Sequence, residues 1–129
     1  MPFALARPLS GAPGRYRLPR GSRIRRGSEI RAILGTGRRR RSENFDLFTQ
    51  PSAARHARFG TIVPKHRRGI VERNRLKRRI REVGRTTILP ALAGTDGGFD
   101  LLVRARPGAY ELTYQQIRAE ITTALQDSP

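Results

Sequence analysis

The segment Glu72–Glu82, with the sequence ERNRLKRRIRE, places six positive charges in eleven positions, yet Leu76 and Ile80 recur at a four-residue spacing. At about 100° per residue, Leu76, Ile80 and Val83 form one narrow stripe, whereas Arg78 lies on the opposite side. A helix of this kind packs its thin apolar stripe against another element and turns its cationic side outward. We therefore expect a helix that lies on a β-sheet and shows a basic face to a partner.

Helical periodicity marks three segments of the chain, residues 28–34, 70–89 and 114–125. Ser28 is the expected N-cap of the first helix, and Thr113 is the expected N-cap of the last. Pro90 is expected to help end the long middle helix, because a helix seldom continues through the residue before a proline.

Strand patterns mark residues 44–50, 57–64 and 99–105. In the first of these, Phe45 and Leu47 share one face, while Asp46, Phe48 and Gln50 share the other. The last strand is nearly all apolar, which is typical of a strand at the centre of a sheet. The order of elements predicts an α+β fold with a single mixed β-sheet packed with about three helices.

The chain is strongly basic, with a net charge of +17 and a pI near 11.9. Residues 1–85 contain 24 of the 27 Lys and Arg side chains but only five acids, so the charge gathers in one part of the chain. Only Glu72 and Glu82 oppose the cations of the middle helix, and like charges four residues apart repel. This arrangement favours a polyanionic partner, and RNA or DNA fits it best.

Length and composition predict one domain over residues 18–126, a disordered basic extension over 1–17 and a short tail over 127–129. No apolar run approaches the length of a membrane span, and cysteine is absent, so no disulfide or thiolate metal site is possible. We therefore expect a cytoplasmic protein without a membrane partner.

RNRLKRRIRE, residues 73–82, resembles the signature helix of the bacterial ribonuclease P protein subunit: Arg-Asn-Arg, a variable residue, Lys-Arg, two variable residues, then Arg-Glu. The resemblance extends from about residue 18 to residue 125, and it includes FGTIVPKHRRGIVERNR and FDLLVRARPGAYELTY. It implies an α-β-β-β-α-β-α sandwich with a left-handed βαβ crossover around the signature helix. It also implies a partner, a large catalytic RNA, with which the protein removes the 5′ leader of precursor tRNA.

The resemblance implies that the RNA holds the catalytic Mg²⁺ ions. The protein is then expected to contribute no catalytic residue and no metal ligand, to bind no cofactor tightly and to need no protein partner. The basic turn, the signature helix and its continuation supply the expected contacts with the catalytic RNA: Lys65, Arg67, Arg68, Arg73, Asn74, Arg75, Lys77, Arg78, Arg81 and Arg85.

A cleft between the first helix and the sheet is implied to hold the single-stranded leader. Phe48 matches an aromatic position in that cleft, and its place among polar residues predicts a partly exposed ring. Ile30 and Leu34 match positions where the family often has Phe, so they are also expected to bind the leader, but through aliphatic side chains without an aromatic ring for a base to stack on. His66 stands where a second Lys is common.

Three other classes of protein compete with this interpretation. A metal-dependent nuclease would need clustered ligands, but Asp46, Asp96 and Asp100 are scattered and both histidines lie in basic surroundings. A ribosomal or other structural RNA-binding protein fits the composition, but the signature helix argues against it. A helix-turn-helix DNA reader is disfavoured because the basic helix adjoins strands.

Overall fold

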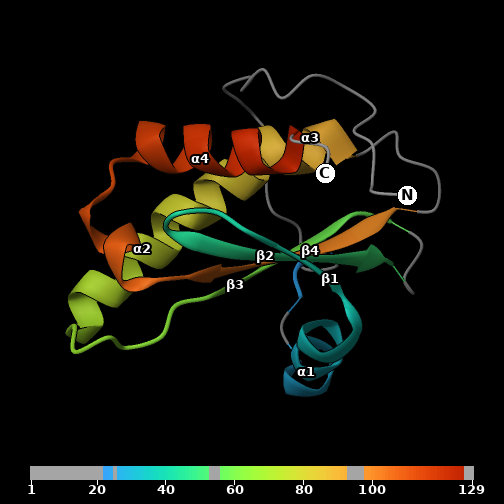
Figure 1. The fold of residues 1–129 in the computed structure, drawn as a ribbon, viewed down its shortest axis with the longest axis horizontal. Coiled ribbons are helices and arrows are strands. Elements are labelled where there is room, and N and C mark those ends of the chain that lie inside the picture. Colours follow the sequence, from blue (N-terminus) through green and yellow to red (C-terminus); the bar gives the residue numbers. More distant parts are fainter. Residues whose placement is uncertain (1–21, 25, 53–55, 93–97, 127–129) are drawn as a thin grey trace.

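Four strands form one mixed β-sheet in the spatial order β1-β2-β4-β3 (Figure 1). The structure is a computed structural model, and it describes residues 22–24, 26–52, 56–92 and 98–126. The predicted extension 1–17 and tail 127–129 lie outside the described residues. The strands are β1 (Arg38–Arg41), β2 (Phe45–Pro51), β3 (Arg58–Ile62) and β4 (Phe99–Ala105).

Strand β4 lies inside the sheet, between β2 and β3, as its apolar sequence predicted. It is antiparallel to β2 and parallel to β3, and β1 pairs with β2 in the antiparallel sense. Because two parallel neighbours need a crossover connection, the chain must leave the sheet between β3 and β4. Helix α2 (Ile70–Val83) lies in that connection.

Helices cover both faces of the sheet (Figure 1). Helix α1 (Gly27–Thr36) packs on the face that carries Phe48, which we call the front face. Helices α2, α3 (Leu89–Leu92) and α4 (Tyr114–Gln126) pack on the other face, the back face. The predicted α+β fold with one mixed sheet and three main helices is therefore confirmed.

The alternation of strand side chains divides the apolar residues into two clusters. Phe45 and Leu47 of β2 and Leu101 of β4 face the back, where the stripes of α2 and α4 bury them. The front cluster is smaller and consists of four buried residues, Ile24, Ile33, Phe48 and Leu102. Because the front cluster is small, α1 leaves part of the front face open.

The helical segment that begins with α2 does not stop before Pro90. It continues through a π-helical turn, Gly84–Ile88, into α3, which contains the proline. In the π-helical turn the backbone N–H of Leu89 donates to the carbonyl oxygen of Gly84, five residues earlier. A regular α-helix would push the Pro90 ring against the carbonyl of Thr86. The wider turn lets the chain stay helical past the proline, so the predicted end was wrong.

Gly84, the first residue of the π-helical turn, packs directly against the ring of Phe59 on β3. A Cβ atom at this position would lie 2.5 Å from the nearest ring carbon of Phe59, which is itself fully buried. Only glycine leaves room for that ring. The cost of a glycine within a helix is thus offset by the packing of an aromatic side chain.

The two expected N-caps had different outcomes. Thr113 accepts a hydrogen bond from the backbone N–H of Gln116, and the Gln116 side chain accepts one from Thr113 N–H, so this cap is confirmed. The Ser28 cap was wrong, because the N-cap of α1 is Arg26, two residues earlier, and it makes no side-chain hydrogen bond, so Ser28 lies inside the first turn.

Candidate nucleic-acid interface

The outer face of α2 carries polar side chains that have no hydrogen-bond or ion-pair partner among the described residues. Leu76, Ile80 and Val83 are buried against the sheet, as the helical projection predicted. Four residues outside this stripe are exposed, and we call them the α2 ridge: Asn74, Arg75, Arg78 and Arg81. Within the described part of the chain, none of these four side chains forms a hydrogen bond or an ion pair. Their donors are therefore available to an outside partner.

Arg68, a predicted RNA contact, is instead held within the molecule. Its guanidinium group pairs with Glu72 at 3.0 Å and with Glu111 at 2.9 Å, and lies 4.9 Å from the centroid of the Tyr110 ring. The hydrogen bond from Arg68 is the main reason why the pKa of Glu72 lies below its usual value. Arg68 therefore joins the turn before α2 to the turn before α4, and its charge is largely balanced.

Arg85 and Arg73 also have internal partners. Arg85, a predicted RNA contact, pairs with Glu82 at 2.6 Å. It lies in the π-helical turn, where regular α-helical phase no longer holds. The guanidinium group of Arg73 donates to the carbonyl oxygen of Val63 at 3.4 Å. Lys77 is partly buried at the edge of α2.

The basic turn before α2 has an unusual backbone. His66 and Arg67 have φ values of 45° and 63°, in the left-handed region that side chains with a Cβ seldom adopt. The Tyr110 hydroxyl donates to the carbonyl oxygen of Pro64, and the rings of His66 and Tyr110 meet edge to face. This packing holds the turn in place and leaves the side chains of Lys65 and Arg67 exposed.

An ion-pair network fastens α1 to the sheet. The Arg58 guanidinium group on β3 binds both carboxylate oxygens of Asp100 on β4 at 2.8 Å, and also Glu29 on α1 at 2.8 Å. The Asp100 hydrogen bonds are the main cause that raises the pKa of Arg58 further above its usual value. The position of α1 over the front face is therefore fixed by charge as well as by the burial of Ile33.

The ring of Phe48 is buried, with only 4% of the residue exposed, so the prediction of a partly exposed ring was wrong. It lies on the front face as expected, but α1 covers it. The guanidinium groups of Arg39 and Arg104 also lie over the ring, 5.9 and 5.2 Å from its centroid. What this part of the front face offers a ligand is the two guanidinium groups rather than the ring.

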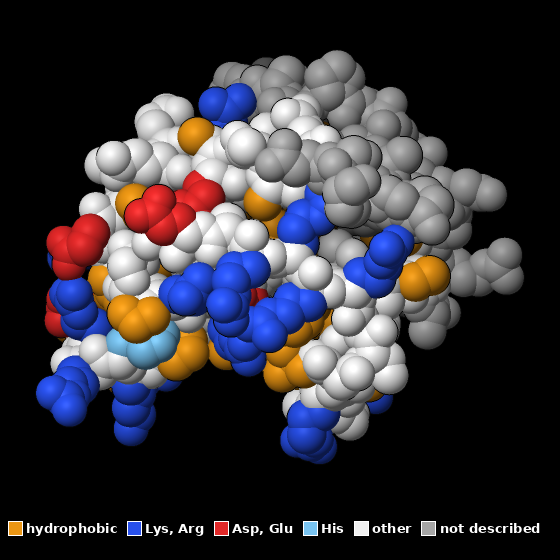
Figure 2. All heavy atoms as spheres, in the orientation of Figure 1, with side chains coloured by type: hydrophobic (Ala, Val, Ile, Leu, Met, Phe, Trp, Pro, Cys, Tyr) orange, Lys and Arg blue, Asp and Glu red, His pale blue; other side chains and the backbone are white. Residues whose placement is uncertain are grey.

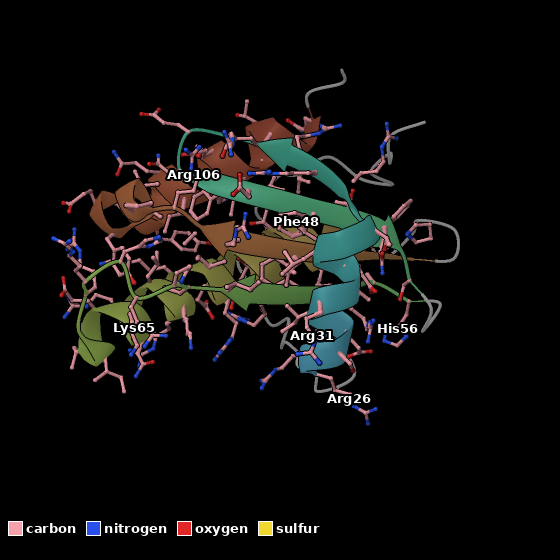
Figure 3. All side chains as sticks on the ribbon, turned by 60° about the horizontal axis from the view of Figure 1, so that its bottom comes forward. Arg26, Arg31, Phe48, His56, Lys65 and Arg106 are labelled. Carbon is pink, nitrogen blue, oxygen red and sulfur yellow. The ribbon has the colours of Figure 1, made fainter. Side chains whose placement is uncertain are left out.

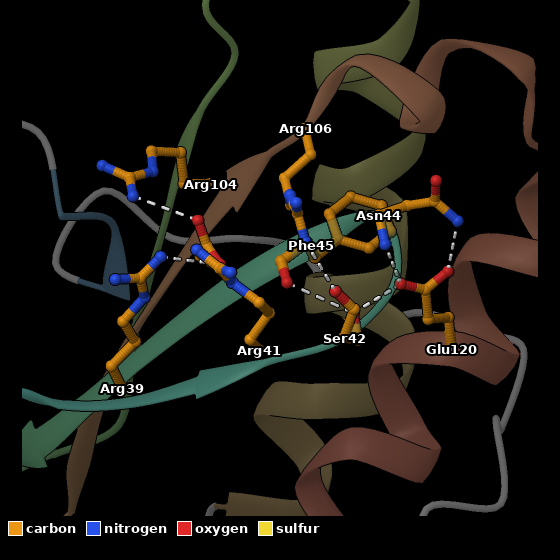
Figure 4. A network of polar contacts seen from close by, with 9 residues as sticks. Arg39, Arg41, Ser42, Asn44, Phe45, Arg104, Arg106 and Glu120 are labelled. Atoms are coloured by element: carbon orange, nitrogen blue, oxygen red, sulfur yellow. Dashed lines mark hydrogen bonds and ion pairs between the residues drawn. The ribbon is translucent and has the colours of Figure 1, made fainter.

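Asp46 organises those arginines. Its carboxylate lies 3.3 Å from Arg39, 3.4 Å from Arg41 and 3.0 Å from Arg104 (Figure 4). Burial would raise the pKa of Asp46, but the hydrogen bonds from Arg104, Arg39 and Arg41 outweigh it and hold the pKa below its usual value. One carboxylate therefore fixes three cations, and the cluster retains an excess of positive charge.

These front-face arginines were not among the predicted site residues. The run Arg38–Arg41 was visible in the sequence, but its assignment to an edge strand was not made. Once β1 pairs with β2, Arg39 lies opposite Phe48 and Arg41 opposite Asp46, which puts both on the front face. Strand alternation beside the acidic position in β2 was the signal that could have revealed the cluster.

The opposite side of β1 and the turn after it are fixed by α4. Glu120 accepts hydrogen bonds from the backbone N–H of Asn44 at 2.6 Å, from the Asn44 side chain at 2.8 Å and from the Ser42 hydroxyl (Figure 4). Arg40 donates to the carbonyl oxygen of Ala124 at 2.7 Å, near the carboxyl end of α4, where carbonyls lack helical partners. These contacts are structural.

A cavity of about 240 Å³ lies between α1, β3 and α2. Its lining brings together Ile30, from the predicted leader-binding set, and Lys77 and Arg81, from the predicted RNA contacts. Arg23, which was not predicted, lies in its wall, and a backbone bridge joins that residue to Phe59 on β3. Leu34, by contrast, is half-buried in the front cluster and does not line this cavity.

Lys and Arg side chains gather around a hollow on one side of the molecule (Figure 2). The hollow opens at the lower edge of that view, between the amino-terminal end of α2 and α1. With this side turned forward, Lys65 lies at the α2 border and Arg26 and Arg31 lie at the α1 border, with Phe48 on the sheet beside α1 (Figure 3). The basic surfaces of α1, α2 and the sheet therefore face one common space.

No helix in the described ranges is long and apolar enough to cross a bilayer. In the same residues, no three His, Asp or Glu side chains lie together as a metal ion would require. Asp46 and Asp100, which a metal-dependent nuclease would need, are each paired with arginine, and Asp96 lies outside the described residues.

Comparisons with known proteins agree on one family. The family model described as Ribonuclease P matches residues 18–128. A ribonuclease P protein component from Desulfotalea psychrophila is 35% identical over 109 residues, covering 83% of this chain and 86% of the relative. One from Microcystis aeruginosa is 34% identical over 113 residues, covering 84% of this chain and 91% of the relative.

Solved structures show the same fold. The RNase P protein of Staphylococcus aureus superposes with a TM-score of 0.70 at 26% identity, covering 81% of this chain and 93% of that one. The RNase P protein of Thermotoga maritima superposes with a TM-score of 0.67 at 20% identity, covering 83% and 98%. The mixed sheet, the basic α2 and the family match over the whole described region show that the chain belongs to the ribonuclease P protein family.

Proposed function

We propose that this chain is the RNA-binding subunit of a ribonuclease P holoenzyme, and that the α2 ridge and the basic turn bind its catalytic RNA. The observation that carries the assignment is the set of unpaired donors on one face of a rigid helix, at Asn74, Arg75, Arg78 and Arg81. Guanidinium groups suit phosphate oxygens, because they offer several fixed donors in one plane. Lys65 and Arg67 extend this surface beyond the start of α2.

In this proposal, the role of each predicted RNA-contact residue depends on whether its side chain has a partner within the protein. Residues without an internal partner make the contacts with the RNA, whereas Arg68 and Arg85 hold the shape of the surface through their glutamates. Two residues lie between these groups: Lys77 lines the cavity, and Arg73 is bonded to the carbonyl oxygen of Val63. This division predicts a larger loss of RNA affinity from Arg78 substitution than from Arg68 substitution, once the folded fraction is taken into account.

We further propose that the single-stranded 5′ leader of precursor tRNA passes through the hollow between α1 and α2. The cavity beside Ile30 supplies an apolar wall, and Lys77 and Arg81 supply cations on the other side. Arg39 and Arg104 lie over the buried Phe48 ring and extend the cationic surface across the sheet. Guanidinium planes can stack on unpaired bases as well as bind phosphates, so the site does not need an exposed aromatic ring.

In this proposal the RNA subunit performs the cleavage with bound Mg²⁺, and the protein contributes binding and positioning. The protein itself binds no cofactor tightly, and it works in the cytoplasm together with its RNA and tRNA precursors. Its contribution to the reaction is then to raise the affinity of the holoenzyme for substrates that still carry a leader.

The experiment measures binding of the folded chain to its transcribed ribonuclease P RNA across a range of salt concentrations. Arg78→Glu should leave the circular dichroism spectrum unchanged, weaken binding by about tenfold or more and reduce the dependence of log affinity on log salt by about one. Arg38→Glu is the matched control, because it makes the same charge change on β1, at the other edge of the sheet.

Leu76→Asp is the fold control, because it would place a charge in the buried stripe and should unfold the domain. The proposed interface is wrong if Arg78→Glu binds like the unmodified chain, or if Arg38→Glu causes an equal loss. Binding of ribosomal RNA in preference to the ribonuclease P RNA would point instead to a structural RNA-binding protein.

A further inference from the structure

Two large apolar side chains at the start of α2 are exposed to solvent. Ile70 is 69% exposed and Val71 is 66% exposed, and among the described residues these are the large hydrophobic side chains that lie exposed. They are adjacent in the chain and belong to the first turn of a fourteen-residue helix. Neither is needed for the core, which uses Leu76, Ile80 and Val83 of the same helix.

The pair belongs to the same face as the α2 ridge. With Leu76 at 0°, Ile70 falls at about 120° and Val71 at about 220° around the helix axis. Asn74 and Arg78 fall between them, at about 160° and 200°. The outer face of α2 therefore begins with two apolar side chains, continues with one amide and ends with guanidinium groups.

The surroundings of the pair are rigid and cationic. The Glu72 side chain accepts the backbone N–H of Gly69 and pairs with Arg68, so the nearby acid is balanced and the first turn is closed. The preceding turn is fixed by its packing on Tyr110, and it leaves Lys65 and Arg67 exposed beside the pair. A partner that covers Ile70 and Val71 must also accept these cations.

The need to accept these cations limits the kinds of partner that can cover Ile70 and Val71. A second copy of this chain carries a net charge of +17 and would meet the same cations, so self-association through this end is opposed by repulsion. RNA satisfies the charge. In a regular RNA helix the base faces are hidden in the stack and the accessible groove displays hydroxyl groups. Only an unpaired nucleotide turned out of the stack offers the apolar faces of a base and a ribose.

We propose that Ile70 and Val71 contact the base and ribose of an unpaired nucleotide in the RNA that the α2 ridge binds. The inference rests on the proposed function and adds a specificity element to it. The guanidinium groups of the ridge bind phosphates at any sequence, whereas the apolar pair selects a place where a nucleotide is unstacked. The pair thereby sets the register of α2 on the RNA.

The test measures how RNA affinity and its salt dependence change when the apolar pair is replaced by polar, uncharged side chains. Ile70→Gln combined with Val71→Gln keeps the helix, since glutamine is a good helix former and both positions are exposed. This double variant should bind the transcribed ribonuclease P RNA about 5- to 30-fold more weakly, with an unchanged salt dependence. Ile70→Leu combined with Val71→Leu is the matched control, and it should bind within about twofold of the unmodified chain.

Chemical probing of the RNA backbone locates the contact. The unmodified chain should protect at least one unpaired nucleotide that becomes reactive again in the double glutamine variant, while protections due to the ridge remain. The inference is overturned if the double glutamine variant binds normally, if its loss comes with a reduced salt dependence, or if the lost protection lies in a duplex. It is also overturned if sedimentation shows that the pair mediates a dimer.

Arg78→Glu is measured in parallel, so that the two proposals fail separately. A loss with Arg78→Glu but none with the double glutamine variant rejects only the apolar contact. Normal binding by both variants rejects the α2 interface itself.

Discussion

Replacement of Gly84 by alanine should destabilise the protein, although the same change in an exposed helix normally stabilises it. The new Cβ atom would lie 2.5, 2.6 and 2.8 Å from three ring carbons of Phe59. Carbon atoms normally approach to about 3.5–4.0 Å, so the ring or the helix would have to move by about 1 Å. Phe59 is 1% exposed and is fixed in β3, which leaves the ring no free space.

The magnitude follows from two opposing effects. Overpacking a core typically costs about 1–3 kcal/mol, and the buried ring puts this site toward the upper end. Alanine recovers about 1 kcal/mol of helix propensity relative to glycine. We therefore expect the free energy of unfolding to fall by about 1–2 kcal/mol, which for a domain of this size lowers Tm by about 5–10 °C.

Urea and thermal unfolding, followed by circular dichroism, measure the effect. Gly35→Ala in α1 is the matched control, because a Cβ there meets no atom within 4 Å. That variant should gain about 0.5–1 kcal/mol. Phe59→Leu should relieve the clash, so the two changes combined should cost less than the sum of their separate effects. The packing argument fails if Gly84→Ala stabilises the protein as much as Gly35→Ala does.

Two further predictions concern the front face. Because its arginines hold the pKa of Asp46 below the unfolded value, this carboxylate stabilises the fold above about pH 4 and loses that effect as pH falls further. Asp46→Asn should therefore be less stable at pH 7 and lose less stability between about pH 5 and pH 3; urea titrations with equal acid-induced losses would contradict this. Ile30→Phe adds a ring to the wall of the cavity and should tighten holoenzyme binding to precursor tRNA several-fold without affecting mature tRNA, and an equal change on both substrates would remove Ile30 from the leader path.

Local periodicity was enough to predict the three main helices, strands β2, β3 and β4, and the buried side of α2. The spacing of Leu76, Ile80 and Val83 determines which face of a helix can be buried, whatever it packs against. The nearly all-apolar sequence of β4 likewise indicated a central position in the sheet. These features depend on neighbours in the chain, and the sequence contains that information directly.

Contacts between distant residues could not be read in the same way. Phe48 is buried because α1 and two arginines cover it, and no pattern within β2 indicates that cover. The pairing of Arg68 with Glu111 joins residues 43 positions apart. The need for glycine at position 84 becomes visible only in the tertiary structure, where the ring of Phe59 lies against it. In each case tertiary packing decided the outcome.

Strand β1 consists of four identical residues, so its own side chains cannot distinguish one alignment with β2 from another. A slip by two positions would still offer one arginine to Asp46 and another to the end of α4. The alignment must therefore be imposed at the ends of the strand, by Gly37, whose N–H binds the carbonyl of Ile33, and by the hydrogen bonds of Glu120 with the turn after the strand. Mutational tolerance in this strand should consequently be governed by its two boundaries, and exchanging one arginine within it should matter less than lengthening or shortening it by one residue.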